Sequence, residues 1–169
     1  LISDAALPIT SVRELIDYAR ANPQKANYGA AGAGLQLAGA LFKSMAGIDA
    51  VHCKNLFLRN KKGDRHFLVV AAHTTAIDIA ALAGRIGEGR LSFASADRLA
   101  AHLGLTPGAV SPFGLINDRA GIVHVLLDGT LRNAARVGFH PNVNTATVVL
   151  SFADFERFLA ARGNPITLM

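Results

Sequence analysis

The order of strand-like and helix-like segments in residues 53–169 is the strongest constraint on the fold. Apolar runs at 56–58 and 66–71 flank the turn 61–64 (Lys-Lys-Gly-Asp), which predicts a β-hairpin. Further strands are expected at 91–93, 110–116, 122–127 and 145–150, and helices at 77–86, 95–103 and 151–163. Because the segments alternate without a regular βαβ period, the sequence predicts an α+β fold with a mixed β-sheet flanked by helices.

Residues 1–52 have a different pattern, which predicts a helix, a loop and a second helix. Ser11 with Glu14 three residues later is a capping box, and Asn22-Pro23 ends the helix that follows. A glycine-rich loop at 29–34 precedes the second expected helix, 35–46. We therefore divide the chain into a helical segment, 1–52, and a domain, 53–169.

Composition and charge narrow the classes of function. Hydrophobic residues make up 51% and charged residues 17%, which allows a real core and excludes a wholly disordered chain. The whole net charge of +5 comes from residues 53–169, with 13 basic and 8 acidic side chains. This excess suits an anionic partner such as RNA, although a merely solvated surface is the other interpretation. The single cysteine, Cys53, excludes an internal disulfide and a multi-cysteine zinc site.

No apolar run reaches the ~18 to 20 residues that a membrane helix needs, so we expect no membrane association. The chain as given opens without a charged-then-apolar leader, which favours a cytoplasmic location. The histidines show no metal-ligand spacing, and we expect neither a metal nor a cofactor.

Several blocks of residues 53–169, in order, resemble the YbaK/ProX family of prolyl-tRNA-editing proteins. The matching blocks are 53–58 (CKNLFL), 89–95 (GRLSFAS), 111–118 (SPFGLIND), and 139–141 (FHP) followed by 144–147 (NTAT). The resemblance is to the free-standing deacylases that remove alanine from proline tRNA. It implies hydrolytic editing of Ala-tRNA(Pro) in trans, with the tRNA acceptor end as partner and prolyl-tRNA synthetase or an elongation factor as further candidate partners.

Residues 1–52 resemble a different family, the periplasmic solute-binding receptors of tripartite tricarboxylate transport. The matching blocks are 9–15 (ITSVREL), 21–23 (ANP), 27–29 (NYG) and 41–47 (LFKSMAG). The two resemblances meet at His52, so we interpret the chain as a chimera. In the editing family an N-terminal segment helps to wall the substrate pocket, and here the receptor-like segment stands in its place. A non-catalytic binding module, an inactive chimera, or a deacylase for another small amino acid such as cysteine are the alternatives.

Lys54 is the first candidate for catalysis. An ammonium at the edge of a strand could hold the ester carbonyl or the terminal phosphate, and the resemblance places the family's essential lysine here. Asn55 would bind the substrate or orient Lys54, or else serve as an ordinary turn residue. His140, which Pro141 restrains to an extended backbone, could bind the amino group or move a proton, or be structural.

The remaining candidates for substrate binding are small or polar residues in two loops. Residues 108–112 fit the family's Gly-x-x-x-Pro loop, whose glycine permits close ligand approach, while a plain connecting loop is the alternative. The full candidate set for substrate binding is Asn55, Gly108, Ser111, Pro112, Gly138, His140 and Asn144.

Two other features have weaker functional interpretations. We interpret Cys53 as an incidental thiol, because no histidine-asparagine partner set accompanies it. The basic side chains of the hairpin could meet tRNA phosphates or could simply form a solvated turn. These side chains are Arg59, Lys61, Lys62 and Arg65.

Overall fold

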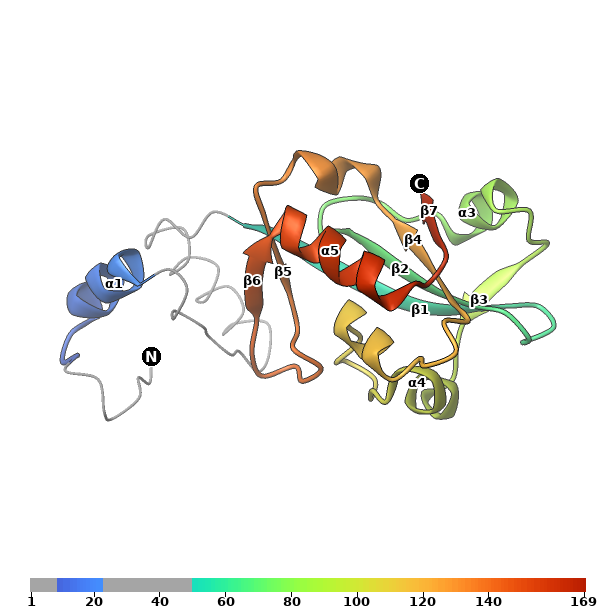
Figure 1. Cartoon of the computed structure of the whole chain (residues 1–169), viewed down its shortest axis with the longest axis horizontal. Helices are drawn as coiled ribbons and strands as arrows, with labels where there is room; N and C mark the ends of the chain where they lie inside the picture. The colour runs from blue at the N-terminus through green and yellow to red at the C-terminus, as the bar shows by residue number, and fades with distance from the viewer. Residues whose placement is uncertain (1–8, 23–49) are drawn as a thin grey trace.

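The computed structural model describes residues 9–22 and 50–169 (Figure 1). Its first elements are α1 (Val12–Ala21), β1 (Val51–Asn60), β2 (His66–Ala72), α3 (Ile79–Arg85), β3 (Leu91–Phe93) and α4 (Ala96–Leu103). They are followed by the 3-10 helix η1 (Pro112–Ile116), β4 (Val123–Leu127), the 3-10 helix η2 (Gly129–Asn133), β5 (Arg136–Phe139), β6 (Val148–Ser151), α5 (Phe152–Arg162) and β7 (Ile166–Leu168).

The strands form one mixed sheet in the order β6-β5-β1-β2-β4-β7, and β3 pairs with β1 outside this path. β1 and β2 form an antiparallel hairpin whose register runs from Cys53 opposite Ala72 to Arg59 opposite His66. The pairs β1–β5, β2–β4 and β4–β7 are parallel. The α+β class with a mixed, helix-flanked sheet is therefore confirmed.

β1 changes neighbours along its length on the side away from β2. Its first residues, Val51 and His52, pair with β5, and residues 58–60 pair with β3. Among the described strands, none pairs with residues 53–56 on that side. In Figure 1, β5 and β3 accordingly lie toward opposite ends of β1. We call residues 53–56, which lack a described strand partner on this side, the β1 gap.

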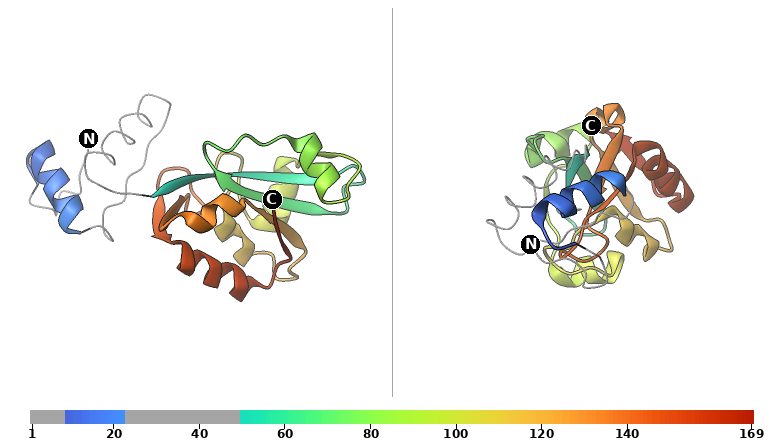
Figure 2. Two further views of the ribbon diagram at one scale, coloured as in Figure 1. Left: turned by 90° about the horizontal axis from the view of Figure 1, so that it is seen from above. Right: turned by 90° about the vertical axis from the view of Figure 1, so that its left-hand side faces the viewer.

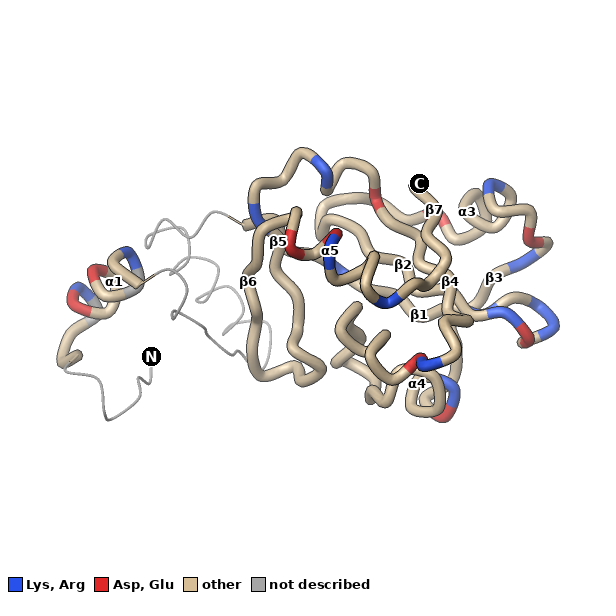
Figure 3. The backbone as a smooth tube through the Cα atoms, in the orientation of Figure 1, with Lys and Arg blue, Asp and Glu red and all other residues tan. Residues whose placement is uncertain are grey.

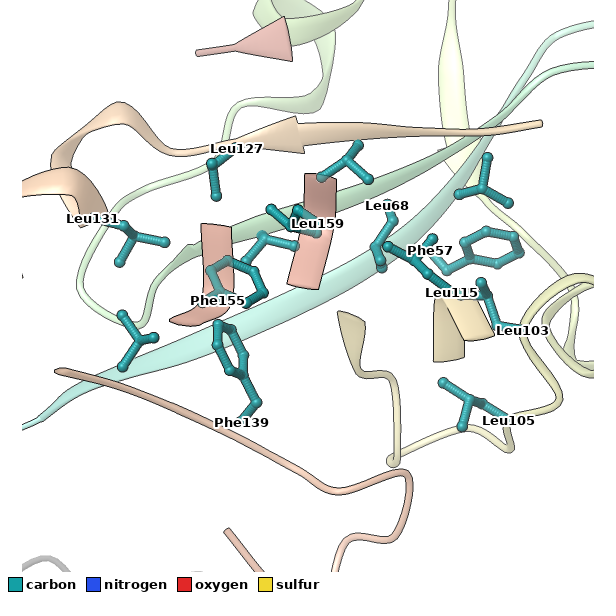
Figure 4. Packing of buried hydrophobic residues seen from close by; sticks show 14 of the residues in the cluster. Phe57, Leu68, Leu103, Leu105, Leu115, Leu127, Leu131, Phe139, Phe155 and Leu159 are labelled. Atoms are coloured by element: carbon teal, nitrogen blue, oxygen red, sulfur yellow. The ribbon is translucent and has the colours of Figure 1, made fainter. Parts of the chain in front are cut away.

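Side chains of β1 alternate between two apolar clusters, one on each face of the sheet. Phe57 belongs to a cluster with Phe155, Leu159 and residues of α4 and η1, shown in Figure 4. Leu58 belongs to a cluster with Leu82 of α3. Figure 2 shows α5 and α3 on opposite sides of the sheet, so we name these sides the α5 face and the α3 face. Odd-numbered residues of β1 lie on the α5 face and even-numbered residues on the α3 face.

Serine side chains begin the predicted helices as expected. The hydroxyls of Ser11, Ser95 and Ser151 accept hydrogen bonds from the backbone N–H groups three residues later. At the other end of α4 and α5, Gly104 and Gly163 adopt left-handed backbones, with φ of 65° and 72°. The helices expected at 95–103 and 151–163 and the first N-terminal helix are thus confirmed, and the strand expected at 91–93 is β3.

The strand expected at 110–116 is wrong, because residues 112–116 form η1 instead. Pro112 stands at the start of this 3-10 helix, where its missing N–H costs nothing, and the Ser111 hydroxyl accepts from the Phe113 N–H. The apolar character of this run reflects burial of Pro112 and Leu115 in the core. The prediction also missed β5, η2 and β7.

The N-terminal segment lies largely outside the described residues. The predicted glycine-rich loop 29–34 and helix 35–46 both belong to the part that the structure does not describe. The proposed boundary between residues 52 and 53 falls inside β1. No helix among the described residues is long and apolar enough to cross a membrane.

Candidate active site at the β1 gap

Lys54 lies on the α3 face of β1, opposite Ala71 of β2. Its ammonium donates a hydrogen bond to the carbonyl of His73, at 3.2 Å, just beyond the end of β2. The lysine is half-buried, so the strand holds its stem while the charged end reaches toward the end of β2. An ammonium has three donors, and this backbone contact occupies one of them. Lys54 can therefore still donate to a ligand.

Asn55 is the next residue and points to the α5 face. Its Nδ2 donates to the Val110 carbonyl at 3.0 Å, which ties β1 to the loop before η1. Its Oδ1 is buried and has no hydrogen-bond partner. Buried amide oxygens are normally satisfied, so this unpaired acceptor is an exception among the described side chains.

The predicted loop residues Gly108 and Ser111 meet the loop that follows β5. The Ser111 hydroxyl donates to the His140 carbonyl and accepts from the Phe113 N–H at 3.2 Å. Gly108 has a left-handed backbone, φ 87°, and a side chain added there would lie 3.6 Å from Nδ2 of Asn144. Loops 104–112 and 140–147 are therefore in direct contact.

Ser111 and Pro112 are buried, and Ser111 is 0% exposed. Because the Ser111 hydroxyl is already used as donor and acceptor inside the protein, we infer that it positions the backbone of His140. Pro112 is the buried first residue of η1, directly after Ser111.

His140 follows directly after the last residue of β5, Phe139. β1 and β5 are parallel and pair His52 with Gly138, so Lys54 and His140 each follow two residues later in the same direction. The Nδ1 of His140 lies 2.9 Å from the Ala146 carbonyl, an arrangement that needs a proton on Nδ1. In the neutral ring the free Nε2 is then an acceptor.

Gly138 lies on the α3 face of β5, next to the ring of His52. A side chain added there would approach the methyl groups of Thr147 and Val149, at 3.4 and 3.7 Å, and Nδ1 of His52 at 3.9 Å. Because Gly138 has no side chain, only its backbone lies between the side chains of Thr147, Val149 and His52. Asn144 is exposed on the outer side of its loop.

Asn142 belongs to the same loop and was not among the predicted site residues. Its backbone is left-handed, φ 61°, and its Oδ1 is buried without a hydrogen-bond partner. Only one other described side chain besides Asn55 and Asn142 has such an atom, Asn164, which lies beside β4. The Pro-Asn dipeptide signals a turn in the sequence, but nothing local indicates the open acceptor.

The Cys53 thiol, next to Lys54, is held in its neutral form. Burial raises the pKa of the Cys53 thiol to about 12, and its Sγ points back to the Val51 carbonyl. This supports the interpretation of Cys53 as an incidental thiol. Among residues 9–22 and 50–169, no group of three or more metal-binding side chains gathers.

Comparisons with known proteins agree on one family. Residues 44–158 match the family model described as the aminoacyl-tRNA editing domain. The prolyl-tRNA editing protein ProX of Acetoanaerobium sticklandii is 52% identical over 111 residues, covering 66% of this chain and 68% of the relative. Prolyl-tRNA synthetase associated domain-containing protein 1 of Mus musculus is 34% identical over 125 residues, covering 72% and 74%.

A solved structure of a proposed trans-editing enzyme for prolyl tRNA synthetase has the same fold. It superposes with a TM-score of 0.59 at 17% identity, covering 95% of this chain and 97% of that one. The family model and the relatives agree, and the chain belongs to the aminoacyl-tRNA editing domain family.

Proposed function

We propose that this protein hydrolyses mischarged aminoacyl-tRNA in trans, and that its substrate is alanine esterified to proline tRNA. The observation that carries the proposal is the arrangement at the β1 gap. It combines the Lys54 ammonium on the α3 face, the buried and unpaired amide oxygen of the next residue, Asn55, on the α5 face, and His140, whose Nδ1 faces the Ala146 carbonyl. This set matches the needs of an aminoacyl ester, which carries a carbonyl, an α-ammonium and a neighbouring hydroxyl.

Each side chain has a role that its contacts allow. Lys54 would stabilise the negative charge that develops on the ester carbonyl oxygen when water attacks the carbonyl carbon. The Oδ1 atoms of Asn55 and Asn142 would accept hydrogen bonds from the α-ammonium of alanine. Nε2 of His140 would accept a proton from a hydroxyl or from the attacking water. The bond between the carbonyl carbon and the ribose oxygen breaks, and the ribose oxygen takes up a proton as alanine leaves.

Such an enzyme is needed because prolyl-tRNA synthetase selects its amino acid by size. A synthetase site built for proline excludes a smaller amino acid poorly, because a missing methylene changes binding by only ~1–3 kcal/mol. A second pocket that admits only small side chains corrects the error. We assign that pocket to the surface beside Gly138, where a single added carbon would lie 3.4 Å from Thr147 Cγ2 and 3.9 Å from His52 Nδ1.

Replacing Lys54 tests the proposal directly. We expect Lys54→Ala to abolish release of alanine from Ala-tRNA(Pro) in single-turnover assays while the thermal unfolding midpoint stays close to that of the wild type. Arg157→Ala, at an exposed position on α5, is the control for loss of a surface charge and should deacylate normally. Undiminished turnover by Lys54→Ala would remove the central residue of the mechanism. Cysteinyl- and prolyl-tRNA assayed in parallel would show which amino acid the pocket accepts.

The same proposal places the protein in the cytoplasm, where charged tRNA is made and used. Prolyl-tRNA synthetase or an elongation factor would deliver the substrate. A pull-down with each purified protein, with and without Ala-tRNA(Pro), tests this part, and failure of both to bind would leave tRNA itself as the partner.

We also propose that residues 1–52 and 53–169 have separate origins, on the strength of the two sequence resemblances. Deleting residues 1–48 keeps β1 complete. If the N-terminal segment walls the pocket, the shortened protein should fold but lose discrimination between alanine and larger amino acids. Unchanged stability and unchanged specificity would show that the segment takes no part in the site.

A further inference from the structure

Phe93 is an aromatic side chain left in solvent at the end of β3. It is 62% exposed, and it is the only aromatic among the large apolar side chains that the described residues expose. Its partner across the strands, Leu58, is 0% exposed. Packing therefore does not explain why this position carries a large ring.

Strand pairing sets the direction of Phe93. Residues directly opposite in an antiparallel pair point to the same face, so Phe93 shares the α3 face with Leu58. Lys54 is four residues before Leu58 in an unbroken register and lies on that face too. At about 3.3 Å per residue, Phe93 stands roughly 13 Å from Lys54 along the strand. Phe93 and His140 therefore flank the β1 gap from opposite ends.

Basic residues, with a few acidic ones among them, lie at the same end of the sheet, around the β1–β2 turn and the start of β3 (Figure 3). Some of them are already engaged: Arg59 with the carbonyls of its own turn, Arg65 with Glu88, and Arg98 with the Gly63 carbonyl. Lys61, Lys62 and Arg90 are exposed and form no ion pair with the described residues. Three cations thus remain available beside the exposed ring.

We propose that Phe93, Arg90, Lys61 and Lys62, which we call the β3 platform, bind the acceptor end of the tRNA. A nucleobase stacks on Phe93, and the three cations meet backbone phosphates. The proposal rests on the function proposed above and adds where the RNA lies: from the ester at Lys54, the acceptor strand runs along the edge of the sheet toward the hairpin.

The chemistry of the platform favours RNA over other partners. Single-stranded ends are held by aromatic rings that stack on bases and by cations that follow the backbone. A single ring among lysines and arginines offers little apolar area to a protein partner, whose interface needs a larger desolvated centre. The edge strand β3 is short and presents the ring beside the charges, as a stacking platform requires.

The test separates stacking from mere apolar bulk. Phe93→Leu keeps an apolar side chain but removes the ring face, and Phe93→Tyr keeps the ring. We expect Phe93→Leu to raise the Kd for uncharged tRNA(Pro) and the KM for Ala-tRNA(Pro) by about 5- to 150-fold with kcat unchanged, as expected for loss of one stacked base. Phe93→Tyr should remain close to the wild type. Ile166→Ala, an exposed apolar position on β7 at the far edge of the sheet, is the matched control.

The cations are tested by salt dependence. Arg90→Ala should lower the slope of log K against log salt by about one phosphate contact, and Lys61→Ala with Lys62→Ala by about two.

Full affinity in Phe93→Leu, or unchanged salt slopes, would overturn the platform while leaving deacylation in place. Weaker binding of a protein partner by Phe93→Leu with normal tRNA binding would assign the surface to that protein and also overturn it. Loss of the proposed function is recognised separately, since the wild type itself would then release no alanine although the binding assays could still be read.

Discussion

The variant Asn55→Leu should separate the effect of the Asn55 side chain on folding stability from its effect on substrate binding. The wild-type side chain donates to Val110 but buries an unpaired Oδ1, and a buried acceptor without a partner costs about 1–3 kcal/mol of folding free energy. Leucine has nearly the same shape and removes that penalty. It also leaves the Val110 carbonyl without its donor, which costs a similar amount. The two effects offset each other, so we expect the free energy of unfolding to change by no more than about 1 kcal/mol.

Activity should change much more. If Oδ1 accepts from the α-ammonium of alanine, its loss removes a hydrogen bond to a charged group, worth about 1.5–3 kcal/mol. That energy corresponds to a fall of about 10- to 150-fold in kcat/KM. The assay follows release of labelled alanine from Ala-tRNA(Pro) in single turnover, and urea unfolding followed by circular dichroism gives the stability.

Asn164→Leu is the matched control, because Asn164 also has a buried, unpaired Oδ1 but lies away from the gap. Its Nδ2 donates to Asp118 and to the Val123 carbonyl, at 2.7 and 2.9 Å. This variant should lose stability while its folded fraction deacylates normally. Normal kcat/KM in Asn55→Leu, or a stability loss well above 3 kcal/mol, would refute the role given to the open acceptor.

Two further predictions concern buried titratable groups. With a pKa of about 12 against an ordinary 9.0, the Cys53 thiol should react with iodoacetamide about a thousandfold more slowly in the folded protein than in urea at the same mildly alkaline pH; comparable rates would contradict its burial. Burial, with the charges of His102 and Arg98, lowers the pKa of His66 from 6.5 to about 4. The unfolded chain therefore takes up a proton first, and the free energy of unfolding should fall by up to about 3 kcal/mol as the pH drops from 6.5 to 4. Urea titrations of His66→Phe should show a shallower pH dependence, and an identical slope would exclude His66 as the source.

Local signals predicted local structure well in this chain. The helix starts at Ser95 and Ser151 depend on a hydroxyl and an N–H three residues apart, and the hairpin depends on one turn between apolar runs. Such features need no information from distant parts of the sequence. They predicted the helices that begin after Ser11, Ser95 and Ser151 and the correct class of fold.

Long-range contacts explain what sequence reasoning missed. β5 is four residues long and contains Gly138, and it is a strand only because β1 and β6 pair with it. The run at 110–116 buries Pro112, Gly114 and Leu115, and apolar character alone does not distinguish a strand from a tight turn.

In the candidate site, too, the residue types could be predicted from the sequence but their arrangement could not. Resemblance supplied Lys54, Asn55 and His140, but their arrangement depends on contacts across 29 and 55 residues of sequence, from Ser111 to His140 and from Asn55 to Val110. The open acceptors of Asn55 and Asn142 follow from burial, which no single residue type encodes.

The change of neighbours along β1 also sets a rule for joining this chain to others. Downstream of position 52, the ladder with β2 holds Lys54 opposite Ala71 whatever precedes it. Upstream of position 53, β1 pairs with β5 only through Val51 and His52. One extra residue between positions 52 and 53 would leave Lys54 in place opposite Ala71. It would shift β5, and with it His140, by one residue relative to Lys54. A fusion at this point must therefore keep the number of residues in β1 unchanged, which matters more than which residues they are.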